Sequence, residues 1–184
     1  MRRLKLHLLA FRDREEGNMV AEGVLAFIML IWWYMASFTF FDALRLKNMN
    51  LKAAYTLADL VTREVKAVNK DYIKGLNTVF DYLTYSPMPT WVRVSSVEWD
   101  NTRKHNEVLW SCATGTGHQV YDNTSIQGVE NRIPVMPEGD TIIIVETFMG
   151  YRPVFKVGLE PRWFSTFITT RPRSSSKIDF SGTC

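Results

Sequence analysis

The chain has 184 residues, of which 46% are hydrophobic and 13% are aromatic, and its formal net charge is +3. A charge balance this close to neutral argues against a nucleic-acid-binding protein and against a strongly acidic partner. The length leaves room for one small folded domain with its own core beside a membrane segment.

An uncharged apolar run at 24–41 (VLAFIMLIWWYMASFTFF) is the first predicted element. A helix over this run would be about 27 Å long at a rise of about 1.5 Å per residue, which matches the hydrocarbon core of a bilayer. Five cations and three acids precede the run within residues 1–17. The positive-inside rule therefore predicts a cytoplasmic N-terminus, a single transmembrane helix and an extracytoplasmic C-terminal domain.

The residues just before the run form a short pattern, Gly17-Asn18-Met19-Val20-Ala21-Glu22. A carboxylate at the edge of an apolar span is costly unless it meets a partner, which makes Glu22 a functional candidate. One interpretation is a prepilin-type signal, in which a membrane peptidase cuts after Gly17 and the new α-ammonium of Asn18 is neutralised by Glu22 of a neighbouring subunit. The other is an uncleaved signal anchor with Glu22 at the headgroup level.

After the span, apolar residues at helical spacing predict a membrane-proximal amphipathic helix. Its stripe consists of two rows spaced by seven, Leu44, Leu51, Ala58 and Val65 with Ala54, Val61 and Val68. We expect this stripe to pack on the folded domain, and the alternative is packing against the same helix of a neighbour. A second short helix or a kinked continuation is predicted at 72–83, where Gly75 interrupts the pattern, and Pro87 and Pro89 end it.

From residue 91 the apolar pattern changes to the period of two that is typical of β-strands. We expect strands at 91–99, 107–113, 141–148 and 163–170. The first should contain a bulge at Ser95-Ser96, because its apolar residues change parity there. The polar loop at 114–131 is long enough to have a role of its own.

Helices followed by about four antiparallel strands predict an α+β fold with the helices on one face of the sheet. The predicted segments are a basic cytoplasmic leader (1–17), a transmembrane helix (18–42), an amphipathic helical segment (43–85), an antiparallel β domain (90–173) and a C-terminal tail (174–184).

The two cysteines, Cys112 and Cys184, both lie outside the cytoplasm on this topology. In an oxidising compartment the default expectation is a disulfide that ties the end of the chain to the domain. In the chain-entropy model it would stabilise the fold by about 4 kcal/mol. The alternative is a buried thiol at Cys112 and an unpaired Cys184.

Patterns that would indicate catalysis or ligand binding are sparse. Cys112 and His118 could serve as thiolate and base of a membrane-anchored thiol enzyme, but the pattern offers no third group to orient the histidine. The histidines lack metal-ligand spacing, so we expect no catalytic residue, no cofactor and no metal. The tryptophans Trp91, Trp99 and Trp110 are expected to face the helices across the sheet instead of stacking on nucleic-acid bases.

Longer segments carry a resemblance to a known family. They are Gly17 to Glu22 with the span, LKNMNLKAAYTLADLVTREV at 46–65, the pair WVRVSSVEWD and EVLWSCATG, GDTIIIVETFMGYRPVF at 139–155 and FITTRPR at 167–173. In these segments the chain resembles the TadE/TadG-like minor pilins (pseudopilins) of bacterial tight-adherence (Tad/Flp) pili, over nearly its whole length. One position departs from the pattern: Gly23 stands where processed pilins of this class tend to carry an aromatic or bulky apolar residue.

The resemblance implies a pilin-like architecture and a non-enzymatic role in assembly of a type IV-like pilus. It implies Gly17 as the cleavage position, Glu22 as the assembly glutamate, and a place in the bacterial inner membrane with the C-terminal domain in the periplasm or within the pilus. The implied partners are a prepilin peptidase, other minor pilins, the major pilin and the inner-membrane pilus platform. The alternative function is an uncleaved single-pass inner-membrane protein with an extracytoplasmic sensor or adhesin domain.

Overall fold

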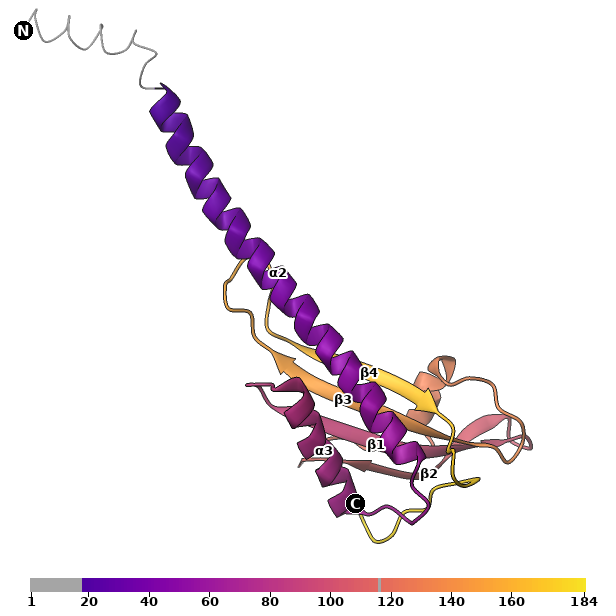
Figure 1. Ribbon diagram of the computed structural model, residues 1–184. Coiled ribbons are helices and arrows are strands. Elements are labelled where there is room, and N and C mark those ends of the chain that lie inside the picture. The colour runs from indigo at the N-terminus through magenta and orange to yellow at the C-terminus, as the bar shows by residue number, and fades with distance from the viewer. Residues whose placement is uncertain (1–17, 116) are drawn as a thin grey trace, which may run out of the picture. The chain divides into compact units, whose positions relative to one another are not determined.

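The computed structural model describes residues 18–115 and 117–184 (Figure 1). Its elements in chain order are α2 (Asn18–Thr62), α3 (Lys70–Thr84), β1 (Thr90–Asp100), β2 (His105–Ala113), the 3-10 helix η2 (Ser125–Arg132), β3 (Thr141–Tyr151) and β4 (Arg162–Thr170). The four strands form one antiparallel sheet in the order β2-β1-β3-β4. The predicted α+β class, with a long apolar N-terminal helix and a four-stranded antiparallel sheet, is therefore confirmed.

The described chain divides into two compact units. The anchor unit comprises α2 as far as Asp42 together with the loop Pro153–Leu159. The sheet unit comprises Ala43–Arg152 and Glu160–Cys184, and so contains the rest of α2 and all four strands.

Within the sheet unit, α2 and α3 cover one face of the sheet, which we call the helix face (Figure 1). Val92 and Val94 of β1 point into this helix-side core, together with Val145 of β3. Val97 belongs to a second core on the opposite, outer face, where it packs with Ile126 of η2 and with other apolar residues. The sheet is thus buried on both faces, because helices cover one and the segment around η2 covers the other.

The change of parity in β1 follows from this double burial. β1 pairs with β3 in an unbroken register from Thr90 to Glu98. A bulge does occur at Ser96/Val97, but only in the pairing with β2, where Leu109 is the extra residue. The prediction that a bulge within β1 causes the change of parity is therefore wrong. Both faces of the strand are covered, so apolar residues can point to either face without a bulge.

The buried side of α2 differs from the predicted stripe. Its buried residues in the sheet unit are Asn50, Ala53, Ala54, Leu57, Ala58, Val61 and Thr62. The row with Ala54 and Val61 is in the core as expected, whereas Leu44 and Leu51 are exposed. The physical reason is that small alanine side chains let the backbone of α2 lie close to the sheet. Alanine is only weakly hydrophobic, so a pattern of hydrophobic residues does not reveal this side of the helix.

The two helices are separated by a short connection instead of a kink at Gly75. α2 ends at Thr62, so Val68 is outside the helix and pairs with Phe180 in an isolated parallel bridge. α3 then begins at its N-cap Asn69, whose side chain accepts a hydrogen bond from the Tyr72 amide at 2.8 Å. Gly75 lies within α3, which shows that one glycine inside a helical pattern did not end it.

Candidate functional site

The first candidate site is the N-terminal part of α2. Asn18 is the first residue of this helix, and Gly17 lies outside the described residues. Glu22 is exposed, and between Asn18 and Phe41 it is the only carboxylate or cationic side chain. Among the described residues, one helix is long and apolar enough to cross a membrane, and it is this one.

The side chains of the apolar run are mostly exposed. The exposed residues include Val24, Leu25, Phe27, Ile28, Leu30, Trp32, Trp33, Tyr34, Phe38 and Phe41. An apolar surface of this extent does not suit water and marks contact with lipid or with other protein. The helix therefore supports membrane association of the chain.

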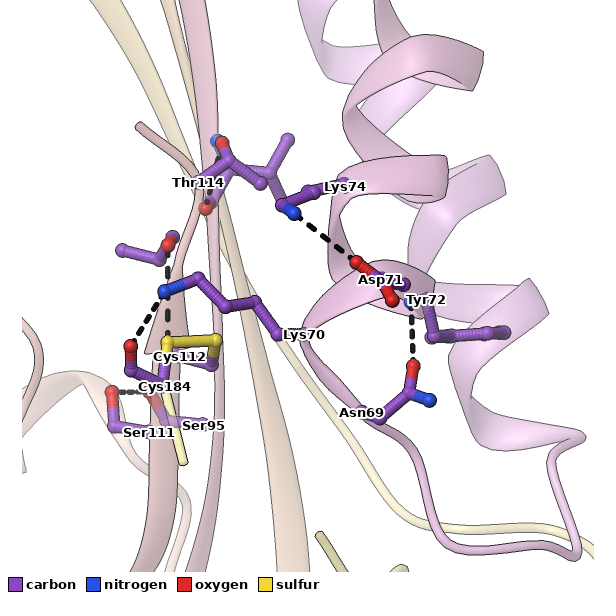
Figure 2. Close-up of a disulfide and its surroundings, with 12 residues drawn as sticks. Asn69, Lys70, Asp71, Tyr72, Lys74, Ser95, Ser111, Cys112, Thr114 and Cys184 are labelled. Atoms are coloured by element: carbon purple, nitrogen blue, oxygen red, sulfur yellow. Dashed lines mark hydrogen bonds and ion pairs between the residues drawn. A yellow bond between two sulfur atoms is a disulfide. The ribbon is translucent and has the colours of Figure 1, made fainter. Parts of the chain in front are cut away.

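The second predicted feature, the disulfide, is present. Cys112 of β2 and Cys184 are bonded, with their Cα atoms 5.4 Å apart and a separation of 72 in sequence (Figure 2). Near the bond, the Lys70 ammonium donates a hydrogen bond to the carbonyl oxygen of Cys184 at 2.7 Å. The segment predicted as a tail is thereby held to the domain, and Ile178 within it belongs to the helix-side core. A disulfide of this kind suggests an oxidising, extracytoplasmic setting.

The same bond removes the thiolate that the Cys112–His118 hypothesis required. Cys112 is buried as well as bonded, and His118 stacks on the indole of Trp91 with ring centroids 4.1 Å apart. Nothing thus activates a nucleophile at Cys112. Among the described residues, no group of three or more His, Cys, Asp or Glu side chains is arranged to hold a metal ion.

No protein-family model, curated protein or solved structure matches this chain.

A buried polar cluster on the outer face was not predicted. Arg93 of β1 and Glu146 of β3 lie opposite each other in the sheet and form an ion pair of 2.6 Å. The guanidinium of Arg93 also donates to the carbonyl oxygen of Gln119 at 2.6 Å and lies 3.9 Å from the ring centroid of Tyr121. The hydroxyl of Tyr121 donates to Glu146 at 3.2 Å. Burial, with the charge of Glu146 adding to it, raises the pKa of the Tyr121 phenol.

This cluster fixes the loop at 114–131 to the sheet. The aromatic rings beside it form a stack in which Trp91 lies against both Phe148 and His118. Only Trp110 packs on the helix-side core, since Trp99 packs on the outer core. The prediction that all three tryptophans face the helices is therefore wrong for Trp91 and Trp99. The missed signal was a charged residue of opposite sign in the middle of each of two apolar strands.

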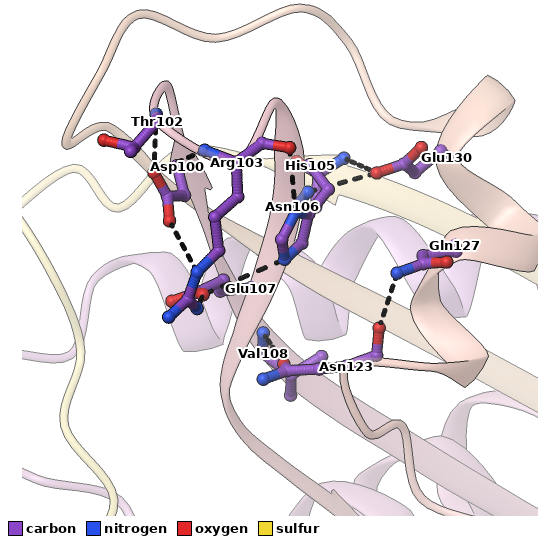
Figure 3. A network of polar contacts seen from close by, with 10 residues as sticks. All are labelled: Asp100, Thr102, Arg103, His105, Asn106, Glu107, Val108, Asn123, Gln127 and Glu130. Carbon is purple, nitrogen blue, oxygen red and sulfur yellow. Dashed lines mark hydrogen bonds and ion pairs between the residues drawn. The ribbon is translucent and has the colours of Figure 1, made fainter.

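The loop at 114–131 also protects the edge of the sheet (Figure 3). The amide of Val108 donates to the Asn123 side chain at 2.8 Å, and the amide of Asn106 donates to the Glu130 carboxylate at 3.1 Å. These two amides of edge strand β2 would otherwise be available to a strand from another molecule. The loop therefore acts as a cap on this edge.

The surface of α2 within the sheet unit contains the last candidate. Leu44 and Tyr55 are each 60% exposed, and Leu51 is 41% exposed. They follow one another at spacings of seven and four residues, so they lie on one exposed side of the helix, where Lys47 and Asn48 separate Leu44 from Leu51. The domain fold does not use this side, which makes it available to a partner.

Proposed function

We propose that the protein is a non-enzymatic minor pilin (pseudopilin) that takes part in the assembly of a tight-adherence pilus. On this proposal it is anchored in the bacterial inner membrane with its N-terminus in the cytoplasm, and a prepilin peptidase processes it after Gly17. The observation that carries the proposal is the position of Glu22, a single acid in an otherwise uncharged stretch from Asn18 to Phe41.

The chemistry of that acid supports an assembly role. An ionised acid costs about 2.5–3.5 kcal/mol at the centre of a span and less at its edge, where Glu22 lies, and a pairing with an opposite charge offsets this cost. Cleavage after Gly17 would create an α-ammonium on Asn18. Residues four apart lie on one helix face about 6 Å apart along the axis, so the ammonium and the Glu22 carboxylate would share one side of the helix. Staggered neighbouring helices could then pair these charges between subunits.

The exposed side of α2 with Leu44, Leu51 and Tyr55 adds a second line of support. The predicted stripe had two possible partners, the chain's own domain or another helix. The domain occupies the alanine-rich side of α2, and the leucine and tyrosine side remains exposed. A helix with two apolar sides can hold its own sheet and a neighbouring subunit at once.

The test is complementation of a deletion strain of the native host. We expect deletion to reduce surface pili, and Glu22→Ala to fail to restore them at a normal protein level. Glu22→Asp, which keeps the charge, is the matched control and should restore them at least in part. Leu51→Glu should impair piliation while the purified domain keeps its stability. Normal pili with Glu22→Ala would contradict the role of the carboxylate.

The second candidate is an uncleaved single-pass inner-membrane protein with a sensor or adhesin domain. Gly23 favours it, because processed pilins of the class tend to have a larger apolar residue after the glutamate. The same deletion strain separates the two candidates, since a sensor or adhesin of this kind predicts normal pili in the absence of the protein.

A further inference from the structure

We propose that the loop Pro153–Leu159 is a membrane contact that rests on the leaflet from which the apolar part of α2 emerges. Its apolar side chains would enter the outer ends of the acyl chains, and Lys156 would bind the anionic phosphate groups of the lipid headgroups. The inference depends on α2 crossing a membrane, and it does not depend on a role in pili.

The loop packs on the part of α2 that is expected to lie in lipid. Phe155 meets Phe38 edge to face, with ring centroids 6.3 Å apart. Two other residues of this part of the helix, Ala36 and Thr39, are buried although most of their neighbours are exposed. The loop and the helix as far as Asp42 belong to the same compact unit. Any depth assigned to Phe38 in a bilayer therefore applies to Phe155 as well.

The depth follows from the sequence of the helix. The uncharged run ends at Phe41, and Asp42 follows it directly. Phe38 lies about 5 Å below the end of the run, at a rise of about 1.5 Å per residue. A residue at that level sits at the boundary between acyl chains and headgroups, where amphipathic segments commonly insert about 5–10 Å. The loop is thus held at the interface by its contact with the helix.

The composition of the loop suits that boundary. Its sequence is PVFKVGL, with Lys156 as its one charged residue, and the exposed Arg152 and Glu160 flank it on either side. Val154, at 65% exposure, and Lys156 are both exposed, whereas Phe155 and Val157 are partly covered. An apolar side chain directed outward is unfavourable in water but favourable against acyl chains. The long lysine side chain can extend its ammonium to the headgroups from the same level.

The backbone of the loop limits how deep it can go. The segment is neither helix nor strand, and one of its amides, on Val157, donates to the Phe155 carbonyl at 3.1 Å. Irregular backbone exposed to the hydrocarbon core is avoided because its polar groups lack partners there. The interface provides water and headgroups for them, so the loop should lie at the surface and not within the core.

The experiment places a fluorescent label on single cysteines in the full chain. The native cysteines are bonded to each other and do not react in the absence of reductant. Val154→Cys reports on the loop, Leu30→Cys on the middle of the apolar run, and Val135→Cys, at a position 96% exposed, on the sheet unit. Each protein is inserted into nanodiscs of phosphatidylcholine alone or mixed in equal parts with phosphatidylglycerol. Quenching is measured with lipids spin-labelled near the headgroup and with aqueous iodide.

We expect the label at Val154→Cys to be quenched by the spin-labelled lipid at least about twofold more than the label at Val135→Cys. Iodide should show the reverse order. Phosphatidylglycerol should increase the lipid quenching at Val154→Cys, and adding Lys156→Gln should remove that increase while lipid quenching in phosphatidylcholine persists. Equal iodide access at Val154→Cys and Val135→Cys would overturn the proposal, as would free access of iodide to Leu30→Cys, because α2 would then not cross the bilayer. No pilus component is present, so failure of the pilus proposal would leave this result unaffected.

Discussion

Asn50 of α2 and Thr147 of β3 share a buried hydrogen bond of 2.6 Å, in which the threonine hydroxyl donates to the asparagine side-chain oxygen. The amide nitrogen of Asn50 donates in turn to the Phe164 carbonyl of β4 at 3.0 Å. One polar side chain in the centre of the alanine-rich side of α2 thus binds two neighbouring strands. This arrangement fixes the position of the helix along the sheet in a way that apolar contacts alone would not.

Asn50→Leu is therefore predicted to destabilise the domain. It leaves the buried Thr147 hydroxyl and the partly buried Phe164 carbonyl without their partner, and we expect a loss of about 2–3 kcal/mol in the free energy of unfolding. Urea unfolding of the full chain in detergent, followed by tryptophan fluorescence, measures it. Thr56→Ala is the control, because the Thr56 hydroxyl bonds only within α2 at the surface. An unchanged unfolding midpoint for Asn50→Leu would show that the bond contributes nothing.

Loss of the disulfide is predicted to weaken the same domain. Cys184→Ser with Cys112→Ala should lower the free energy of unfolding by about 4 kcal/mol, because a loop of this length is no longer closed in the unfolded chain. Hydrogen exchange should also become faster at Val68 and Ser181, whose amides bond across the pairing that the disulfide holds. Reduction of the wild-type protein should reproduce both effects. Slow exchange at these amides in the reduced protein would contradict the holding role.

The cap on β2 leads to a prediction about association. Asn123→Ala combined with Glu130→Ala removes the acceptors from the Val108 and Asn106 amides and opens the strand edge. We expect the variant to form dimers or larger species by edge-to-edge pairing, as detected by light scattering after gel filtration in detergent. Asn101→Ala, an exposed position in the β1–β2 turn, should remain like the wild type. A variant that keeps the wild-type mass would mean that the edge needs no cap.

Alkaline pH is predicted to destabilise the sheet unit through Tyr121. Its pKa is raised in the folded state above the usual value of about 10, chiefly by burial, with Glu146 adding to the effect. The stabilising contribution is complete below about pH 10 and is lost as the pH rises through the folded-state pKa. Tyr121→Phe should flatten the alkaline fall in unfolding free energy, whereas Tyr82→Phe, at an exposed position, should not. Equal pH dependence in the wild type and Tyr121→Phe would exclude this cause.

Some features of this fold could be predicted from the sequence and others could not, because they depend on different kinds of contact. The span, the helix-to-strand order and the Cys112–Cys184 pair follow from composition and period, which are local properties of the chain. The outer-face core, the Arg93–Glu146 pair and the edge cap depend on which strands become neighbours and on what covers the second face. Those are long-range properties, and a period of two cannot distinguish a strand covered on one face from one covered on both.

The most direct test of the pilin proposal is the mass of the native protein's N-terminal peptide, compared between strains with and without the prepilin peptidase. We predict that the protein begins at Asn18 in the first strain and at Met1 in the second. A protein that begins at Met1 in both strains would contradict processing, and with it the assignment of Glu22 as the partner of a newly formed α-ammonium.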